Sequence, residues 1–149
     1  MKRRKGFTLL ELSIVLAVIA IFTGGIFVVF RQSPRSALEN ASLQLRADMR
    51  YAQRRAIIDG QRIDIMLEPA HNRYRVRVVG GSWEEIRVVY FQDGVRLRGT
   101  NISGNNVEFL PRGTINGAGR IYLDNGRYSL YLTTLVSSGR VRISDTTVN

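Results

Sequence analysis

The sequence predicts an α+β protein in which a long N-terminal α-helix packs on an antiparallel β-sheet head. Three successive hydrophobic patterns along the 149 residues predict it. An apolar run fills residues 7–30, apolar residues at helical spacing continue through residues 31–60, and period-two alternation fills much of residues 61–149. A short basic segment, residues 1–6, precedes all three.

The basic residues at the N-terminus orient the chain. Residues 2–5 read Lys-Arg-Arg-Lys and are followed by Gly6. Positive charge beside an apolar segment stays on the cytoplasmic side, so the C-terminal head is expected outside the membrane. The formal net charge is +10, and every basic residue except Lys2 and Lys5 is arginine. The chain has no cysteine, which excludes disulfides and thiolate metal sites.

The apolar run at residues 7–30 has the length of a transmembrane helix, which needs about 20 residues. A secretory signal peptide has a shorter apolar region of about 7–15 residues. A plain anchor accounts for the length but not for Glu11, since a charge in lipid costs about 2.5–3.5 kcal/mol. Glu11 lies four residues after Phe7, so its side chain could also reach the membrane surface.

The segment from Lys5 to Glu11, which reads KGFTLLE, resembles the class III signal of type IV prepilins and pseudopilins. The resemblance implies a pilin-like fold, with residues 1–6 as a prepilin leader and residues 7–30 as a transmembrane and filament-core helix. It also implies cleavage after Gly6 by a prepilin peptidase and N-methylation of Phe7. Glu11 would then pair with the N-terminal amine of a neighbouring subunit, which gives a buried carboxylate the partner it needs.

The second helical segment, residues 31–60, is amphipathic. Ser33-Pro34 interrupts the apolar run, and a helix is expected from about Ser36 to Asp59, with Gly60 as its C-cap. One stripe is expected to face the sheet: Leu38, Ala41, Leu45, Met49, Ala52 and Ala56. Arginines also recur at every fourth position. They form either a solvated face or a docking edge for an acidic neighbour or nucleic acid: Arg46, Arg50 and Arg54.

The head, residues 61–149, is expected to be nearly all β. Alternation predicts a hairpin from strands 63–67 and 74–78, with a turn at residues 69–72. Asn125-Gly126 predicts a second hairpin with a type I′ turn. The remaining expected strands are 86–91, which looks buried, 95–98, 107–110 and 136–143, with a polar loop at 99–106.

Arginines alternate with apolar residues in two of these strands. If the sheet faces are contiguous, they form a basic surface; pairing with Asp64, Glu84 or Glu85 would cancel it. The residues are Arg73, Arg75, Arg77, Arg96 and Arg98.

Two short segments of the head resemble the family of type II secretion pseudopilin H and FimT. They are Phe-Leu-Pro-Arg-Gly at 109–113 and Ser-Gly-Arg-Val-Arg at 138–142. In this family, H-type members lie in the tip region of a periplasmic pseudopilus, whereas FimT members bind DNA through a Gly-Arg-x-Arg motif. The resemblance makes Arg140 and Arg142 candidate DNA-binding residues. Three tyrosines are candidates for base stacking, namely Tyr122, Tyr128 and Tyr131, while Tyr74, Phe91 and Phe109 are expected in the core.

The resulting functional prediction is a minor pseudopilin of a type II secretion system, a structural subunit of a short extracytoplasmic filament used in protein export. The alternative is a FimT-like minor pilin that binds DNA for natural transformation. No enzyme activity, metal or cofactor is expected, because His71 is the single histidine and no cysteine accompanies it. Expected partners are other pseudopilins or pilins, the prepilin peptidase, an inner-membrane assembly platform and, in the alternative, DNA. The expected location is the inner membrane, crossed once, and then the filament.

Overall fold

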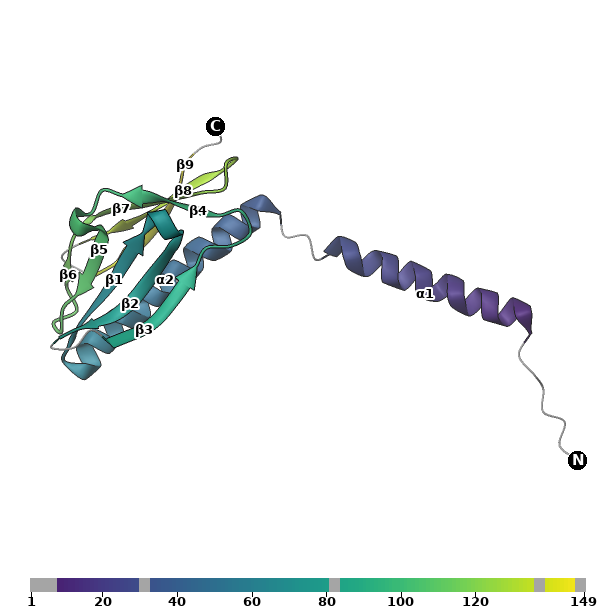
Figure 1. The fold of residues 1–149 in the computed structure, drawn as a ribbon, viewed down its shortest axis with the longest axis horizontal. Helices are drawn as coiled ribbons and strands as arrows, with labels where there is room; N and C mark the ends of the chain where they lie inside the picture. The colour runs from purple at the N-terminus through teal and green to yellow at the C-terminus, as the bar shows by residue number, and fades with distance from the viewer. Residues whose placement is uncertain (1–7, 30–32, 81–83, 136–138, 147–149) are drawn as a thin grey trace, which may run out of the picture. The chain divides into compact units, whose positions relative to one another are not determined.

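The structure is a computed structural model of the chain, and it describes residues 8–29, 33–80, 84–135 and 139–146. The chain forms two compact units, Met1–Ser33 and Pro34–Asn149. Figure 1 gives the order of the helices and strands within each unit.

The first unit contains helix α1, Leu9–Val29. Thr8 precedes its first turn, and the Thr8 Oγ1 accepts a hydrogen bond from the Glu11 backbone N–H at 3.3 Å, as an N-cap residue does. From Leu9 to Ile21 every side chain is exposed, so this helix presents apolar residues on all of its sides. Among the described residues, neither helix has both the length and the apolarity that a membrane span requires.

Helix α2, Pro34–Asp59, begins the second unit. Proline suits the first helical position because the N–H that it lacks would have no partner there. The predicted stripe is confirmed: five of its six residues are buried and Ala41 is partly buried against the core. The helix ends at Asp59, and Gly60 follows it with a left-handed φ of 65°, as the predicted C-cap requires.

The head contains two antiparallel sheets rather than one. Sheet A has the order β3-β2-β1-β5-β6, and sheet B has the order β4-β7-β8-β9. The strands of sheet A are β1 Arg62–Glu68, β2 Arg73–Val79, β3 Glu84–Tyr90, β5 Asn106–Phe109 and β6 Ile115–Asn116. Those of sheet B are β4 Arg96–Thr100, β7 Gly119–Asp124, β8 Ser129–Thr134 and β9 Val141–Thr146.

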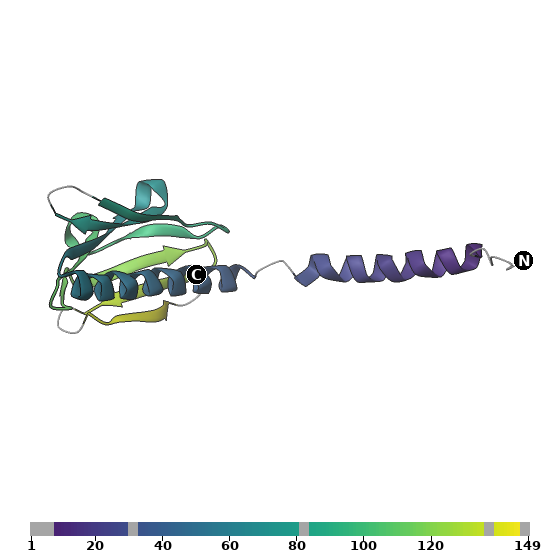
Figure 2. The same ribbon diagram turned by 90° about the horizontal axis from the view of Figure 1, so that it is seen from below.

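Helix α2 belongs to a single core that both sheets share. It contacts β1 and β5 of sheet A and also β7, β8 and β9 of sheet B, and Figure 2 shows strands of the two sheets on either side of it. Met49 of the helix, Tyr74 of β2 and Phe109 of β5 are all fully buried. The expected core positions of Tyr74, Phe91 and Phe109 are therefore confirmed.

Two predictions about strands are wrong. The strand expected to be buried, residues 86–91, is β3 at the edge of sheet A, where Ile86 is only half-buried and Tyr90 is exposed. The strand expected at 136–143 begins at Val141, since Gly139 and Arg140 are not in a strand, and the Leu135 N–H donates to the Arg140 carbonyl before it. Residues 136–138 lie outside the described part of the chain.

The predicted hairpin around Asn125-Gly126 is confirmed, but its turn is not of type I′. That type needs a positive φ at both central residues. Gly126 has a φ of 83°, whereas Asn125 is not left-handed. The Asn125 Oδ1 instead accepts hydrogen bonds from the N–H groups of Arg127 and Tyr128, which closes the turn through a side chain.

Candidate functional site

Glu11 is the third residue of α1, and its side chain is exposed. A carboxylate in a first helical turn is stabilised by the positive end of the helix dipole. The Thr8-x-x-Glu11 spacing is that of a capping box, so Glu11 also has a local reason to stand in this first turn. Gly6 and Phe7 lie outside the described residues, so cleavage and methylation there stay predictions.

The two candidate DNA-binding arginines are both exposed. Arg142 lies in β9, and Arg140 lies in the turn directly before this strand. Val141 and Ile143 are partly buried against the core, so the two arginines and these two apolar residues lie on opposite faces of the segment. Neither arginine has an acidic partner within the part of the chain that the structure describes.

The two head segments that resemble the pseudopilin H family meet on α2. Gln53 of the helix donates a hydrogen bond from Nε2 to the Gly113 carbonyl at 2.7 Å. Gly139 is buried beside them with a φ of 60°, and a Cβ there would lie 2.0 Å from the Gln53 Nε2. Gln53 could not be predicted from the sequence, because no local pattern indicates a contact with a residue 60 positions away.

Of the two alternatives for the arginines of β2, a basic surface or pairing with acidic residues, the structure shows pairing. Arg77 binds Asp64 through two hydrogen bonds of 2.6 and 3.0 Å, and Arg73 binds Glu68 at 2.6 Å. Arg75 contacts the same Glu68 carboxylate, and it also lies 3.6 Å from Glu85. Burial acts to raise the pKa of Glu68, but the hydrogen bonds from Arg73 and Arg75 outweigh it and hold that pKa below its usual value.

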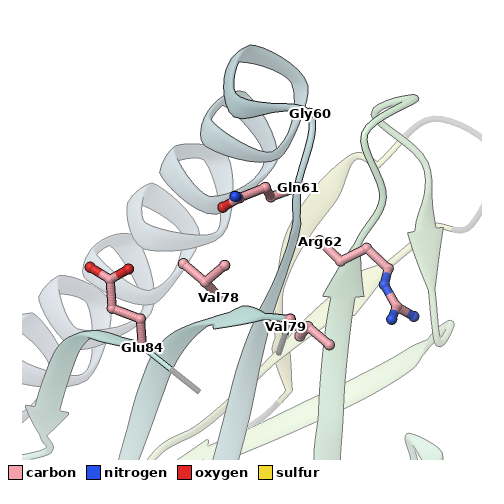
Figure 3. A pocket seen from close by; sticks show the side chains of 7 residues that line it. Gly60, Gln61, Arg62, Val78, Val79 and Glu84 are labelled. Carbon is pink, nitrogen blue, oxygen red and sulfur yellow. The ribbon is translucent and has the colours of Figure 1, made fainter. Parts of the chain in front are cut away.

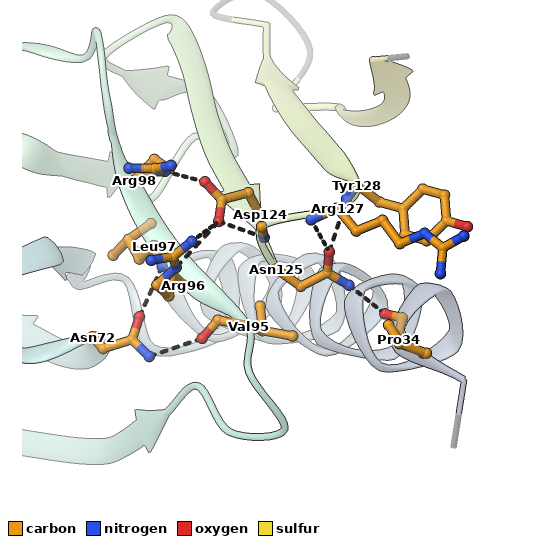
Figure 4. Close-up of polar contacts among 11 residues, drawn as sticks. Pro34, Asn72, Val95, Arg96, Leu97, Arg98, Asp124, Asn125, Arg127 and Tyr128 are labelled. Carbon is orange, nitrogen blue, oxygen red and sulfur yellow. Dashed lines mark hydrogen bonds and ion pairs between the residues drawn. The ribbon is translucent and has the colours of Figure 1, made fainter. Parts of the chain in front are cut away.

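In sheet B, Asp124 is the carboxylate that pairs with the arginines of β4, as Figure 4 shows. Its buried carboxylate accepts from Arg98, from Arg96 at 3.3 Å and from the Gly126 N–H at 3.2 Å. Burial acts to raise the pKa of Asp124, but the hydrogen bonds from Arg98 and Gly126 and the nearby positive charges hold it below its usual value. Arg96 and Arg98 are therefore neutralised.

Another buried acid, Asp48, belongs to α2 itself. It accepts from the Tyr74 hydroxyl at 2.5 Å, from Arg87 at 2.5 Å and from Gln44 at 3.1 Å. Burial, together with the hydrogen bond to Asp48 and its charge, raises the pKa of Tyr74 far above its usual value. This network ties the helix to β2 and β3 and leaves the tyrosine permanently protonated.

Figure 3 shows a pocket where α2 ends and β1 begins. Its lining includes the polar side chains of Gln61, Arg62 and Glu84, and those of Arg62 and Glu84 point away from each other. Within the described ranges, no three side chains of His, Asp or Glu lie close enough together to hold a metal ion.

After these pairings, a set of arginines remains without an acidic partner in the described part of the chain. Three lie on α2, four on the strands and turns of sheet B, and Arg112 lies in the loop between β5 and β6 of sheet A. They are Arg46, Arg50, Arg54, Arg112, Arg120, Arg127, Arg140 and Arg142. In the described part of the head, arginines without an acidic partner thus lie mostly on α2 and sheet B, whereas those of β2 and β4 are paired with carboxylates.

Comparison with known proteins gives matches at both ends of the chain. Residues 1–27 match the prokaryotic N-terminal methylation motif, and residues 41–146 match the type II transport protein GspH. No curated protein sequence matches the chain significantly.

Two solved structures of the minor pseudopilin EpsH from the type II secretion system of Vibrio cholerae share the fold, each at 11% sequence identity. One gives a TM-score of 0.62 and covers 72% of this chain and 96% of EpsH. The other gives 0.59 and covers 77% and 98%. With a GspH match over more than two thirds of its residues, the chain belongs to the GspH family of type II transport proteins.

Proposed function

We propose that this chain is a minor pseudopilin of a type II secretion system, a structural subunit of a short extracytoplasmic filament used in protein export. The observation that carries the proposal is the pair of family matches on one chain. A methylation motif covers residues 1–27 and a GspH region covers residues 41–146. The two EpsH structures with the same fold are described as minor pseudopilins of such a system.

In this proposal, α1 anchors the subunit in the inner membrane and later packs in the filament core. The support is its apolar surface, which is exposed on all sides from Leu9 to Ile21. A helix that is apolar all round needs lipid or other helices around it. The head then lies outside the membrane, and the partners are a prepilin peptidase, an assembly platform and other pseudopilins.

Glu11 is proposed to guide assembly. Cleavage after Gly6 would create an ammonium group at Phe7, four residues before the carboxylate. In an apolar filament core an unpaired charge is costly, and a hydrogen-bonded pair of opposite charges offsets much of that cost. A neighbour's ammonium would therefore fix the axial position at which one helix packs on the next.

The test uses the full chain in cells that carry the secretion machinery. Mass spectrometry of the purified protein should find an N-terminus at methylated Phe7. Glu11→Gln should still be processed, but cross-links between engineered cysteines on neighbouring subunits should fall about tenfold, because the charge pair is lost. Ser13→Ala is the matched control, since the Ser13 hydroxyl only bonds the Leu9 carbonyl of its own helix.

A mature chain that still begins at Met1, or Glu11→Gln subunits that cross-link as well as the unaltered ones, would refute the proposal. DNA capture is not carried forward as a second function. The exposure of Arg140 and Arg142 is compatible with it, but the family match names transport.

A further inference from the structure

The outer face of sheet B carries a regular grid of arginine, tyrosine and hydroxyl side chains, all of them exposed or half-buried. Strand register places Arg120, Thr133 and Arg142 side by side on β7, β8 and β9. The next row on the same face is Tyr122, Tyr131 and Ser144. We call these six residues the Arg-Tyr face.

The other side of these strands forms the core, so the orientation of the Arg-Tyr face is fixed. Ile121 and Leu132, which alternate with the grid residues, are fully buried. Arg120 and Arg142 are exposed, and Tyr122 is 38% exposed. Two strand spacings separate the two arginines, about 10 Å between their backbones.

The two tyrosine rings pack against each other, and one of them supports the Arg120 guanidinium. The rings of Tyr122 and Tyr131 lie 6.4 Å apart, and the Arg120 guanidinium lies over the Tyr131 ring at 5.0 Å from its centre. A guanidinium stacked on a ring still presents the N–H groups at its edge, which match the two oxygens of a carboxylate. The stacking therefore prepares Arg120 to bind an anion.

We propose that the Arg-Tyr face docks a protein partner through carboxylates on the partner's surface. The inference rests on the proposed function in that a subunit used in protein export meets other proteins. Arginine and tyrosine are the residue types enriched in the energetic centres of protein interfaces. Neither arginine of the face has an acidic partner in the part of the chain that the structure describes, so the complementary charge must come from outside.

The geometry favours an acidic protein partner over a second copy of this chain and over a nucleic-acid strand. A second copy of the chain would bring the same positive face against itself, which is repulsive. A nucleic-acid strand binds such sheets by stacking bases on aromatic rings. Here Arg120 already covers the Tyr131 ring, so a base would first have to displace it.

The binding test uses the full chain in a zwitterionic detergent and three fluorescent probes. These are a decapeptide rich in Asp and Glu, its Asn and Gln counterpart, and a ten-nucleotide oligothymidine. Arg120→Gln with Arg142→Gln should weaken binding of the acidic peptide at least about tenfold, as expected when central arginines are lost. Arg46→Gln with Arg50→Gln removes the same charge from α2 and should weaken it less than about threefold.

A further variant tests whether the Tyr131 ring under Arg120 contributes to binding. Tyr131→Leu keeps the strand apolar but removes the ring under Arg120, and it should weaken peptide binding about threefold, the size of a cation–π contact. Circular dichroism and thermal unfolding confirm that each variant is folded. Equal losses of peptide binding for the two arginine pairs would refute the proposal. It would also be refuted if oligothymidine bound more tightly than the peptide and lost more affinity than the peptide in Arg120→Gln with Arg142→Gln.

Export in cells separates this inference from the proposed function. Arg142→Glu should reduce secretion while N-terminal processing and subunit cross-links stay normal. Full secretion with Arg142→Glu would overturn the inference alone. A chain that is neither processed nor cross-linked before any substitution would overturn the proposed function instead.

Discussion

At the scale of single residues, Gly139 has a steric reason to be glycine. Its φ of 60° is left-handed, and a Cβ would meet the Gln53 amide at 2.0 Å and the Gly113 carbonyl at 2.7 Å. The backbone at Gly139 therefore lies so close to Gln53 of α2 that a Cβ atom has no room. This contact places Arg140 and Arg142 at the start of the strand.

Gly139→Ala should lower the free energy of unfolding by about 2–4 kcal/mol, the sum of left-handed strain and overpacking. Urea denaturation followed by circular dichroism measures it. Gly94→Ala is the matched control, because Gly94 has a φ of 76° and nothing within 4 Å of its Cβ position. The control should lose only about 1 kcal/mol, and equal losses in the two variants would show that Gln53 does not constrain the turn.

At the scale of elements, one side chain joins the β7–β8 turn to the start of α2. The Asn125 Nδ2 donates to the Pro34 carbonyl at 2.6 Å, while its Oδ1 holds the turn itself (Figure 4). The Asn-Gly pair thus does more than reverse the chain. It also fastens the first turn of the helix to sheet B, 91 residues along the sequence.

Asn125→Asp should separate these two roles. A carboxylate still accepts from the turn N–H groups but cannot donate to Pro34, so the expected loss is about 1–2 kcal/mol. Amide hydrogen exchange should quicken in the first turns of α2 while the β7–β8 pairing stays protected. Asn101→Asp is the control, because only the acceptor oxygen of Asn101 is used, by the Arg120 N–H at 2.6 Å. If exchange in α2 is unchanged, the link does not hold the helix.

The position of β3 at the edge of sheet A explains why the prediction that this strand is buried is wrong. Its apolar residues, among them Ile86 and Val89, suggested burial on both faces, but the strand has β2 on one side only. Burial depends on which strands are neighbours, and that is a property of the sheet order. Likewise β6 has only two residues, too few for any alternation to show in the sequence.

At the scale of the whole molecule, carboxylates and arginines of the head are matched across strands and between helix and sheet. Asp64, Glu68, Asp48 and Asp124 all bind arginines of other elements. In two of them, Glu68 and Asp124, the folded state holds the pKa of the carboxylate below its usual value. A lowered pKa in the folded state stabilises the fold above the unfolded pKa, and this stabilisation is lost as the pH falls through the folded pKa.

The free energy of unfolding should therefore fall as the pH decreases from about 5 to 3. Asp124→Asn should cost about 1 kcal/mol at pH 7, since both arginines are largely exposed, and should make that fall shallower. Denaturant titrations at several pH values test this. Asp93→Asn is the control, because Asp93 has no ion pair in the described part of the head. A control that flattens the profile equally would assign the acid sensitivity to net charge.

The sequence by itself determined the family, the amphipathic helix and the two main hairpins. These depend on local information: the KGFTLLE segment, a repeat of three and four residues from Leu38 to Ala56, and alternation around short turns. The family resemblance is confirmed by the GspH match, and the helical stripe by burial. The roles of Gly6, Phe7 and Glu11 stay predictions.

Only the tertiary structure decided which charges remain free. Arg77 and Arg142 look alike in the sequence, each alternating with valine in a strand. In the fold Arg77 lies against the buried Asp64, whereas Arg142 faces solvent beside Thr133. The reason is that ion pairs form between strands brought together by sheet order and register, and these depend on contacts across the whole core.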